Sequence, residues 1–422
     1  MSKVVNSVNI YFKDSLVGIL SYDGIDDRFD FRYDDNWTKN GFELSPALSF
    51  EQNYNSTTIK NFIDNLLPEG NHLETLSQYF QISKNNKYAL IQAIGYETTG
   101  ALTFCKDIKD LKTTFTKIEN KDLISRIKQR KNIPLSIWDG KPRLSIAGVQ
   151  DKLPVCIIDD SFGFGEGTLA STHILKFDND GDNLVQNEYL SLFLASKANL
   201  NVAENKLIKL EDELILQIKR FDRELVENRY VNRVHIIDSV QALNLPTSYK
   251  YERNFGSGVH VKDIKEGVSF AKLFSLIDIC SNPLITKKEL IKWICINLIL
   301  GNSDAHGKNV SFFISKDGIN LAPFYDIVNI SLYKDKYEQD IAMGIDEEFC
   351  IEKLKPYDFQ EFYKTININK KLFIKEYITI SKIIIDTLNA RDFDSEYLNE
   401  DFINIYQQDI ANRVKHLNSV II

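Results

Sequence analysis

The sequence is poor in the residues that build metal sites and disulfide frameworks. Its 422 residues include five cysteines, which are odd in number and widely spaced, and six histidines. No CxxC pair, HExxH motif or Cys/His cluster occurs, so we do not expect a structural zinc site. The cysteines stand among apolar neighbours, and we interpret them as reduced core residues.

Long apolar runs and an excess of basic charge are also missing. No apolar run reaches the roughly 18 residues of a membrane-spanning helix, and residues 1–6 lack the apolar core of a signal peptide. Lys and Arg number 51 against 59 Asp and Glu, which gives a net charge of −8 and argues against a broad nucleic-acid-binding surface. We therefore expect a cytoplasmic protein that does not contact membranes.

The composition, 43% hydrophobic and 26% charged, is that of a globular protein with two or three domains' worth of core. Residues 1–105 read as an N-terminal α/β subdomain, in which we identify no chemistry. Its pattern predicts strands within 4–50, helices within 58–80 that break at Pro68-Glu69-Gly70, a helix at 87–93 and a strand at 100–104.

The rest of the chain divides into a strand-rich half and a helix-rich half. Residues 106–133 alternate charges and predict a charged helical connector. Residues 134–223 are rich in strands and form a candidate nucleotide-binding lobe, and residues 224–422 form a helical lobe with periodic runs at 269–280, 287–300, 371–389 and 400–417. We predict an α+β fold with two lobes of the protein-kinase type and the candidate site between them.

The stretch 297–313 carries the main candidate for chemistry. An apolar helical run stops at Gly301, and a polar loop containing Asp304 and Asn309 follows. After it come a strand, an Asp-Gly turn, a second strand and then Asp326. Phosphoryl transfer needs one carboxylate to orient the attacking hydroxyl and oxygen ligands to hold Mg²⁺, and this order of Asp, Asn and Asp is that of protein kinases. The alternative is a surface loop in which these residues only serve turn chemistry.

Lys176 stands inside a run, 171–177, that otherwise reads as a buried strand. A buried ammonium needs an anionic partner, and the helix that follows offers Glu188. A strand lysine paired in this way can grip nucleotide phosphates, whereas the alternative is an edge-strand lysine that points to water. Further along, the segment 219–221 connects the two lobes and would offer its backbone to an adenine edge.

The loop before the strand 153–158 reads as a strand–loop–strand with a small Ala-Gly tip. Backbone N–H groups there could cover nucleotide phosphates, or the loop is an ordinary hairpin. The loop and other segments together resemble the HipA family, the serine/threonine-kinase toxins of bacterial type II toxin–antitoxin systems. The resemblance covers about residues 5–415 and rests on an ordered set of motifs: Asn65-Leu66-Leu67-Pro68-Glu69-Gly70, Gly100-Ala101-Leu102, Ser145-Ile146-Ala147-Gly148-Val149-Gln150-Asp151-Lys152, Thr172-His173-Ile174-Leu175-Lys176, Asn187-Glu188, Arg220-Phe221-Asp222-Arg223, Gln241-Ala242-Leu243-Asn244-Leu245-Pro246, Lys250-Tyr251-Glu252, Asp304-Ala305-His306-Gly307-Lys308-Asn309 and Pro323-Phe324-Tyr325-Asp326-Ile327.

The resemblance implies a role for each matching position. Asp304 would be the catalytic base, Asn309 and Asp326 would hold Mg²⁺, and Ser145 would be the site of an inhibitory autophosphorylation. Lys176, supported by an ion pair with Glu188, would bind the phosphates of ATP. The other implied ATP-binding residues are Ala147, Gly148, Val149, Gln150, Asp151 and Lys152 over the phosphates, Lys219, Arg220 and Phe221 at the adenine, and His306, Gly307, Lys308 and Tyr325 below the nucleotide.

The resemblance also implies partners. The protein substrate would be an aminoacyl-tRNA synthetase, and a HipB-like helix-turn-helix antitoxin would bind the chain and make most of the contacts to DNA. The segment 254–265 is longer than the family leads us to expect and could shape the choice of substrate. Two other classes remain as alternatives: a catalytically silent corepressor that only holds an antitoxin on DNA, and a small-molecule phosphotransferase.

Overall fold

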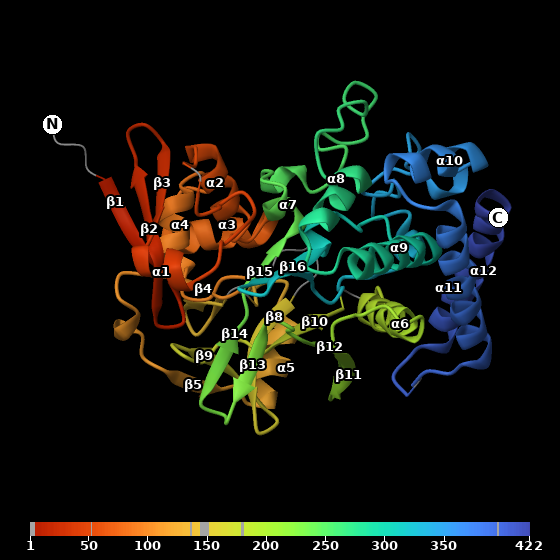
Figure 1. The fold of residues 1–422 in the computed structure, drawn as a ribbon. Coiled ribbons are helices and arrows are strands. Elements are labelled where there is room, and N and C mark those ends of the chain that lie inside the picture. Colours follow the sequence, from red (N-terminus) through yellow and green to blue (C-terminus); the bar gives the residue numbers. More distant parts are fainter. Residues whose placement is uncertain (1–4, 52, 136, 144–151, 179–180, 395) are drawn as a thin grey trace.

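The computed structural model of the chain describes residues 5–51, 53–135, 137–143, 152–178, 181–394 and 396–422. Figure 1 shows three parts: an N-terminal α/β part in red and orange, a sheet-rich lobe below it, and a helical lobe that ends in blue at the right. The predicted α+β architecture with two lobes is confirmed.

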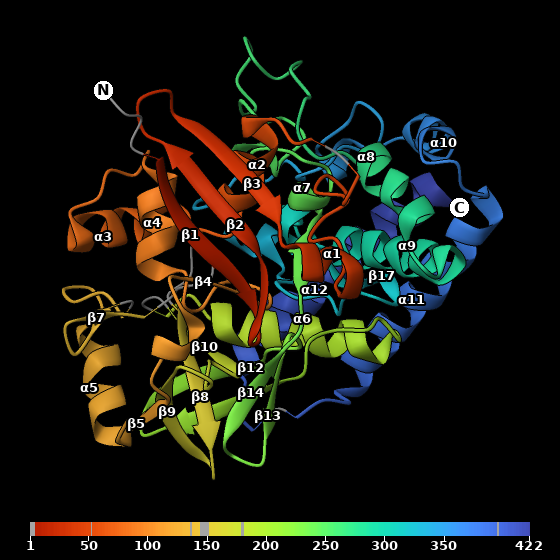
Figure 2. The same cartoon turned by 60° about the vertical axis from the view of Figure 1, so that its left-hand side comes forward.

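The N-terminal part is an antiparallel sheet covered by helices. Its strands lie in the order β3-β2-β1-β4. In β3 the side chains Phe29, Phe31 and Tyr33 are buried and alternate with exposed residues, so one face of the sheet is apolar. Figure 2 views the sheet from its outer face, with α2 and α4 behind it. The elements are β1 (Val5–Phe12), β2 (Ser15–Asp23), β3 (Arg28–Tyr33), α1 (Asp35–Asn40), α2 (Ser56–Asp64), α3 (Gly70–Phe80), α4 (Lys87–Ile94) and β4 (Leu102–Cys105).

The sheet-rich lobe contains six antiparallel strands in the order β11-β12-β10-β8-β9-β5. Strand β10 lies inside this sheet, paired with β8 on one side and β12 on the other. Helix α6 follows β10 and packs against it. The elements are β5 (Thr114–Lys117), α5 (Asn120–Gln129), the small hairpin β6 (Ile137–Trp138) and β7 (Lys141–Pro142), β8 (Lys152–Ile158), β9 (Ser161–Glu166), β10 (His173–Phe177), α6 (Leu184–Lys197), β11 (Asn205–Leu210) and β12 (Glu213–Lys219).

The segment 106–133, which the sequence predicts to be a charged helical connector, also builds this lobe. Its strand β5 pairs with β9 at the edge of the sheet. In α5 the side chains of Leu123 and Ile127 are fully buried. The charged residues of the segment occupy the exposed face, and they outnumber the few apolar residues that anchor it. The charge alternation therefore concealed a narrow apolar stripe.

The helical lobe begins with three short strands that the sequence did not predict, β13 (Arg223–Val226), β14 (Tyr230–Arg233) and β15 (Ile236–Asp238). Strand β15 pairs with β16 (Ser311–Ser315), and β16 pairs with β17 (Gly318–Leu321), so the predicted hairpin of the candidate site is confirmed. Helix α10 was also not predicted. The helices are α7 (Ser239–Ala242), α8 (Phe270–Ser275), α9 (Pro283–Leu300), α10 (Pro356–Thr365), α11 (Lys370–Ala390) and α12 (Glu400–Ile421).

One hydrophobic core joins the N-terminal part to the helical lobe. It includes Phe62 of α2, Val240 of α7 and Trp293 of α9, all buried in the same cluster. The strands of the sheet-rich lobe bury apolar side chains in further clusters, of which one contains Leu175 and Ile215 and another contains Leu216 and Ile218. The N-terminal part and the helical lobe therefore form one packed body, and the sheet-rich lobe joins it through α6, whose Leu190 and Leu194 are buried in the same core.

Helix α9 ends at Gly301, where the candidate loop begins. Gly301 has a φ of +69°, and its N–H donates to the carbonyl of Asn297. A Cβ atom here would lie 2.5 Å from Cζ of Arg413 on α12. The Arg413 guanidinium donates to the carbonyl of Ile299 (3.1 Å) and to Asp409 (2.6 Å). The start of the loop is thus held against the last helix of the chain.

We expect Gly301→Ala to lower the free energy of unfolding by about 2–4 kcal/mol, because alanine is strained at this positive φ and its Cβ atom displaces a buried arginine. Urea denaturation measures this difference. Gly140→Ala is the matched control, since Gly140 has a φ of +68° and no atom within 4 Å of the added Cβ. Equal losses of stability in the two variants would show that contact with Arg413 contributes nothing.

Candidate active site

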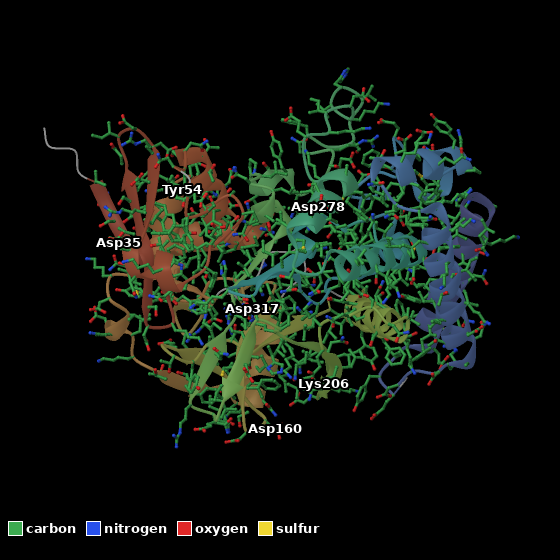
Figure 3. All side chains as sticks on the ribbon, in the orientation of Figure 1. Asp35, Tyr54, Asp160, Lys206, Asp278 and Asp317 are labelled. Atoms are coloured by element: carbon green, nitrogen blue, oxygen red, sulfur yellow. The ribbon has the colours of Figure 1, made fainter. Side chains whose placement is uncertain are left out.

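A cavity of about 620 Å³ lies between the lobes and is lined by residues from all three parts of the chain. The sheet-rich lobe contributes Lys152 and Lys176, the helical lobe contributes Asp304 and Asp326, and the N-terminal part contributes Glu69. Figure 3 draws the side chains of the whole molecule as sticks, and the label Asp317 there marks the turn of the β16–β17 hairpin.

Four hydrogen bonds fix Asp304 on its loop. Its carbonyl accepts from the N–H of His306 (2.8 Å) and from the side-chain amide of Asn309 (2.9 Å). Its own N–H donates to Oδ1 of Asn302 (3.2 Å), and its carboxylate Oδ1 accepts from the hydroxyl of Tyr251 (2.6 Å). Because the Asn309 nitrogen is bonded in this way, its amide oxygen is the atom left for another partner.

Asp326 follows β17 and has a φ of +53°, in the left-handed region that a non-glycine residue seldom adopts. Such strained residues cluster at functional sites. The carbonyl of Asp326 accepts from the amide of Asn302 (3.3 Å), and its carboxylate forms an ion pair with Lys176. One buried residue, Asn302, therefore contacts the backbone of both Asp304 and Asp326.

Lys176 and Glu188 form a buried ion pair, with Nζ of Lys176 at 2.6 and 2.8 Å from the two carboxylate oxygens. The alternative of an edge-strand lysine that points to water is wrong, because β10 lies inside the sheet and Lys176 is only 5% exposed. Burial by itself would lower the pKa of Lys176, but Asp326 and Glu188 outweigh it, so the pKa is raised. Lys176 therefore stays charged at neutral pH.

Lys152 lies directly opposite Lys176, on the neighbouring strand β8. Burial lowers the pKa of Lys152 to about 8, although the charge of Asp326 partly opposes this. Burial would raise the pKa of Asp326, but Lys176 and Lys152 lower it to about 2. The ammonium groups of Lys176 and Lys152 thus face the carboxylates of Asp326 and Glu188. A cation bound to Asp326 would make the net charge of this group positive, which favours an anionic ligand.

The segment 219–221 is predicted to offer its backbone to an adenine edge. Two of its three backbone N–H groups already donate to carbonyls of the protein. The N–H of Lys219 donates to Glu204 (2.8 Å) and that of Arg220 donates to Thr172 (2.9 Å). The guanidinium of Arg220 points away into a buried cluster, where it bonds Asp222 at 2.9 and 3.0 Å. Phe221 packs against the ring of Tyr325 at 5.7 Å between centroids.

Lys308 and Tyr325 are predicted to lie below the nucleotide. Both form hydrogen bonds mainly within the protein itself. Lys308 lines the cavity, but its ammonium donates to Asp238 (2.7 Å) and to the side chain of Asn65 (3.0 Å). The Tyr325 hydroxyl donates to the carbonyl of Lys308 (2.6 Å). Lys308 therefore holds the candidate loop against the N-terminal part, and Tyr325 bonds the backbone of that loop. Among the described residues predicted to lie below the nucleotide, His306, Lys308 and Tyr325 line the cavity, and Gly307 does not.

Sequence reasoning missed three residues that contact this site: Glu69, Tyr251 and Asn302. Glu69 lies 2.9 Å from Lys250 and 3.9 Å from Lys308. The signal for Glu69 was available in its motif, where a carboxylate follows a helix-breaking proline, although we assigned no chemistry to that subdomain. Ser145 and the loop residues Ala147, Gly148, Val149, Gln150 and Asp151 lie outside the described residues.

Comparisons with known proteins show the family of this chain. Residues 8–105 match the HipA N-terminal domain, and residues 144–387 match the HipA-like C-terminal domain. The serine/threonine-protein kinase toxin HipA of Shewanella oneidensis is 41% identical over 381 residues, which cover 90% of this chain and 87% of that protein. The chain belongs to the HipA family.

A HipA structure matches nearly the whole chain. It comes from the Shewanella oneidensis toxin–antitoxin complex of HipA, HipB and operator DNA, with a TM-score of 0.90, 38% sequence identity and 98% coverage of both chains. A putative kinase of Sinorhizobium fredii is 25% identical and covers 97% of this chain and 98% of its own.

As a HipA-family protein, the chain is a serine/threonine protein kinase with a kinase-like fold. Protein kinases use ATP as the phosphoryl donor. A small-molecule phosphotransferase finds no support in these comparisons. Within the described ranges, no helix is long and apolar enough to span a bilayer, and no group of three or more His, Cys, Asp or Glu residues is arranged to hold a metal.

We expect Lys176→Met to weaken ATP binding by about ten- to a hundredfold, because a charged hydrogen bond to phosphate contributes about 1.5–3 kcal/mol. Glu188→Gln should act in the same direction, since it removes the charge that orients Lys176. Isothermal titration calorimetry with ATP and magnesium measures both. The control is Lys197→Met, on the same helix as Glu188, which removes an exposed pair with Asp392 and a contact with the ring of Phe193, both away from the cavity. Unchanged affinity in folded Lys176→Met would contradict this assignment.

Proposed function

We propose that this HipA-family kinase transfers the γ-phosphoryl group of ATP to a serine or threonine hydroxyl of a protein, with Asp304 as the general base. The observation that carries the proposal is the position of Asp304 and Asp326 around one buried amide, that of Asn302. Asp326 in turn contacts Lys176, so the base, the second carboxylate and the lysine belong to one connected site.

The residues present fit a magnesium ion. Asn309 has its nitrogen bonded to the carbonyl of Asp304, which leaves the amide oxygen available, and Asp326 is ionised at neutral pH. Mg²⁺ prefers oxygen ligands and is usually bound by one or two carboxylates together with nucleotide phosphates. Asn309 and Asp326 would hold the ion, which supplies charge neutralisation for the transferring phosphoryl group.

The same geometry suggests how ATP is oriented. Lys176 and Lys152 line the cavity from adjacent strands, and we assign both to the phosphates. The amides of Lys219 and Arg220 are already used, so we assign the N–H of Phe221 to the adenine edge. Asp304 would then accept the proton of the acceptor hydroxyl as the new bond to phosphorus forms.

We further propose that the kinase is the toxin of a HipBA-like system. The Shewanella oneidensis relative was crystallised with HipB and operator DNA, which supports a HipB-like helix-turn-helix antitoxin as the partner. The net charge of −8 supports DNA contact mainly through that antitoxin. From the family resemblance we propose an aminoacyl-tRNA synthetase as the protein substrate. Labelled ATP in a whole-cell lysate, followed by identification of the labelled protein, tests this choice.

Replacing either proposed catalytic carboxylate should abolish phosphoryl transfer. Asp304→Asn should keep ATP affinity within about twofold while transfer falls by at least about a hundredfold, as loss of a general base does. Asp326→Asn should also lose magnesium-dependent ATP binding, because it removes charge from the metal site. Labelling with radioactive ATP measures transfer, and growth arrest on expression should disappear in parallel.

Asp317→Asn is the matched control for both variants, because Asp317 lies in the exposed turn of the same hairpin. It should keep full activity. Phosphoryl transfer that survives in Asp304→Asn would contradict the assignment of Asp304 as the base. If wild-type protein also labels no acceptor, the silent corepressor becomes the better description.

We propose that Ser145 is autophosphorylated and that this switches the kinase off. A phosphate at Ser145 would carry about −1.5 to −2 charges at neutral pH, and its repulsion of ATP would draw the loop off the nucleotide. Intact-mass and peptide mass spectrometry after incubation with ATP and magnesium should find phosphate on Ser145 in wild-type protein and none in Asp304→Asn. Active protein that stays unmodified at Ser145 would refute the switch and leave the kinase assignment standing.

A further inference from the structure

The carboxylate of Asp304 is anchored at one oxygen. Its Oδ1 accepts a hydrogen bond of 2.6 Å from the hydroxyl of Tyr251. In the part of the chain that the structure describes, no other hydrogen bond or ion pair to this carboxylate is recorded, and Oδ2 is left free. A base that must accept a proton from a protein hydroxyl needs one free oxygen in a fixed direction.

The backbone around Tyr251 is clamped from two sides. The N–H of Gly307, three residues after Asp304, donates to the carbonyl of Lys250 (2.9 Å), and the N–H of Val268 donates to the carbonyl of Tyr249 (2.8 Å). Gly267 lies so close that a Cβ atom there would stand 1.8 Å from the carbonyl oxygen of Tyr251. The segment that carries the tyrosine is therefore fixed relative to the loop that carries the base.

The ring of Tyr251 is fixed as well. It meets the imidazole of His306 edge to face, with centroids 5.1 Å apart and planes at 88°. The ammonium of Lys250 lies 5.4 Å from the ring centroid and is itself held by Glu69 at 2.9 Å. Burial, reinforced by the charge of Asp304, raises the pKa of Tyr251. The phenol is thus protonated at neutral pH and acts as a donor.

We propose that Tyr251 is a positioning residue for the phosphoryl transfer: its hydroxyl holds Oδ1 of Asp304 so that Oδ2 faces the acceptor hydroxyl. The terminal torsion of an aspartate has a broad profile, so an unanchored carboxylate samples many orientations. Small misplacements of a reacting group can cost about a hundredfold in rate. This inference rests on the proposed role of Asp304 and adds a residue that the ordered motifs did not identify as functional.

Tyr251→Phe tests the proposal because phenylalanine keeps the ring against His306 and removes only the donor. The assay measures transfer from labelled ATP to the proteins of a heat-treated lysate at several ATP concentrations, which separates kcat from KM for ATP. We expect kcat to fall by about ten- to a hundredfold, with KM for ATP within about twofold. Calorimetric ATP affinity and the melting temperature should match the wild type, which shows that the variant is folded.

Tyr249→Phe is the matched control, two residues away on the same segment, because its hydroxyl bonds the exposed carboxylate of Glu266 at 3.0 Å and no carboxylate of the proposed site. It should behave as wild type. If Tyr251→Phe also behaves as wild type, raises KM alone or increases kcat, the positioning role is overturned.

Asp304→Asn in the same assay distinguishes the proposed role of Tyr251 from the proposed role of Asp304. An inactive Asp304→Asn together with a normal Tyr251→Phe refutes only the role of Tyr251. An active Asp304→Asn refutes the proposed base, whatever Tyr251→Phe does.

Discussion

The ammonium of Lys176 is held between Glu188 and Asp326, and this buried interaction ties together strand β10, helix α6 and the segment after β17. Removing one partner of such a group leaves an uncompensated charge in the interior, which typically costs about 3–5 kcal/mol. The three elements are therefore constrained to meet at one point. Because Lys176, Glu188 and Asp326 also line the cavity, the interaction that joins these elements places charges of both signs at the proposed active site.

A second set of charges makes the N-terminal part a wall of the site. Glu69 lies between Lys250 and Lys308, and Lys308 also bonds Asn65. Burial would raise the pKa of Glu69, but the two lysines lower it, so the carboxylate stays ionised. Since this part also shares one hydrophobic core with the helical lobe, it is packed into the catalytic body. It is not an appendage, although its sequence shows no recognisable chemistry.

Polar contacts between α6 and the helical lobe extend this arrangement to the last helix. Asn187, beside Glu188, accepts from the N–H of Asn329 at 2.8 Å, and Asn329 donates to Asp409 on α12 at 2.9 Å. Arg413 connects Asp409 to the end of α9. The helix with the ion pair, the segment after Asp326 and the start of the loop of Asp304 therefore share one buried network.

The sequence by itself determined the local elements and the order of the site. The helix that stops at Gly301, the hairpin after Asn309 and the strand of Lys176 follow from hydrophobic periodicity and turn residues, which act between near neighbours. Tertiary structure alone decided which charges compensate one another, as for Lys176 and Asp326, which are 150 positions apart. It also decided that Tyr251 meets Asp304, and that the charged segment 106–133 has a buried stripe and an edge strand. The sequence around a polar residue does not show which partner it contacts, because the partner is set by how distant segments pack around a buried charge.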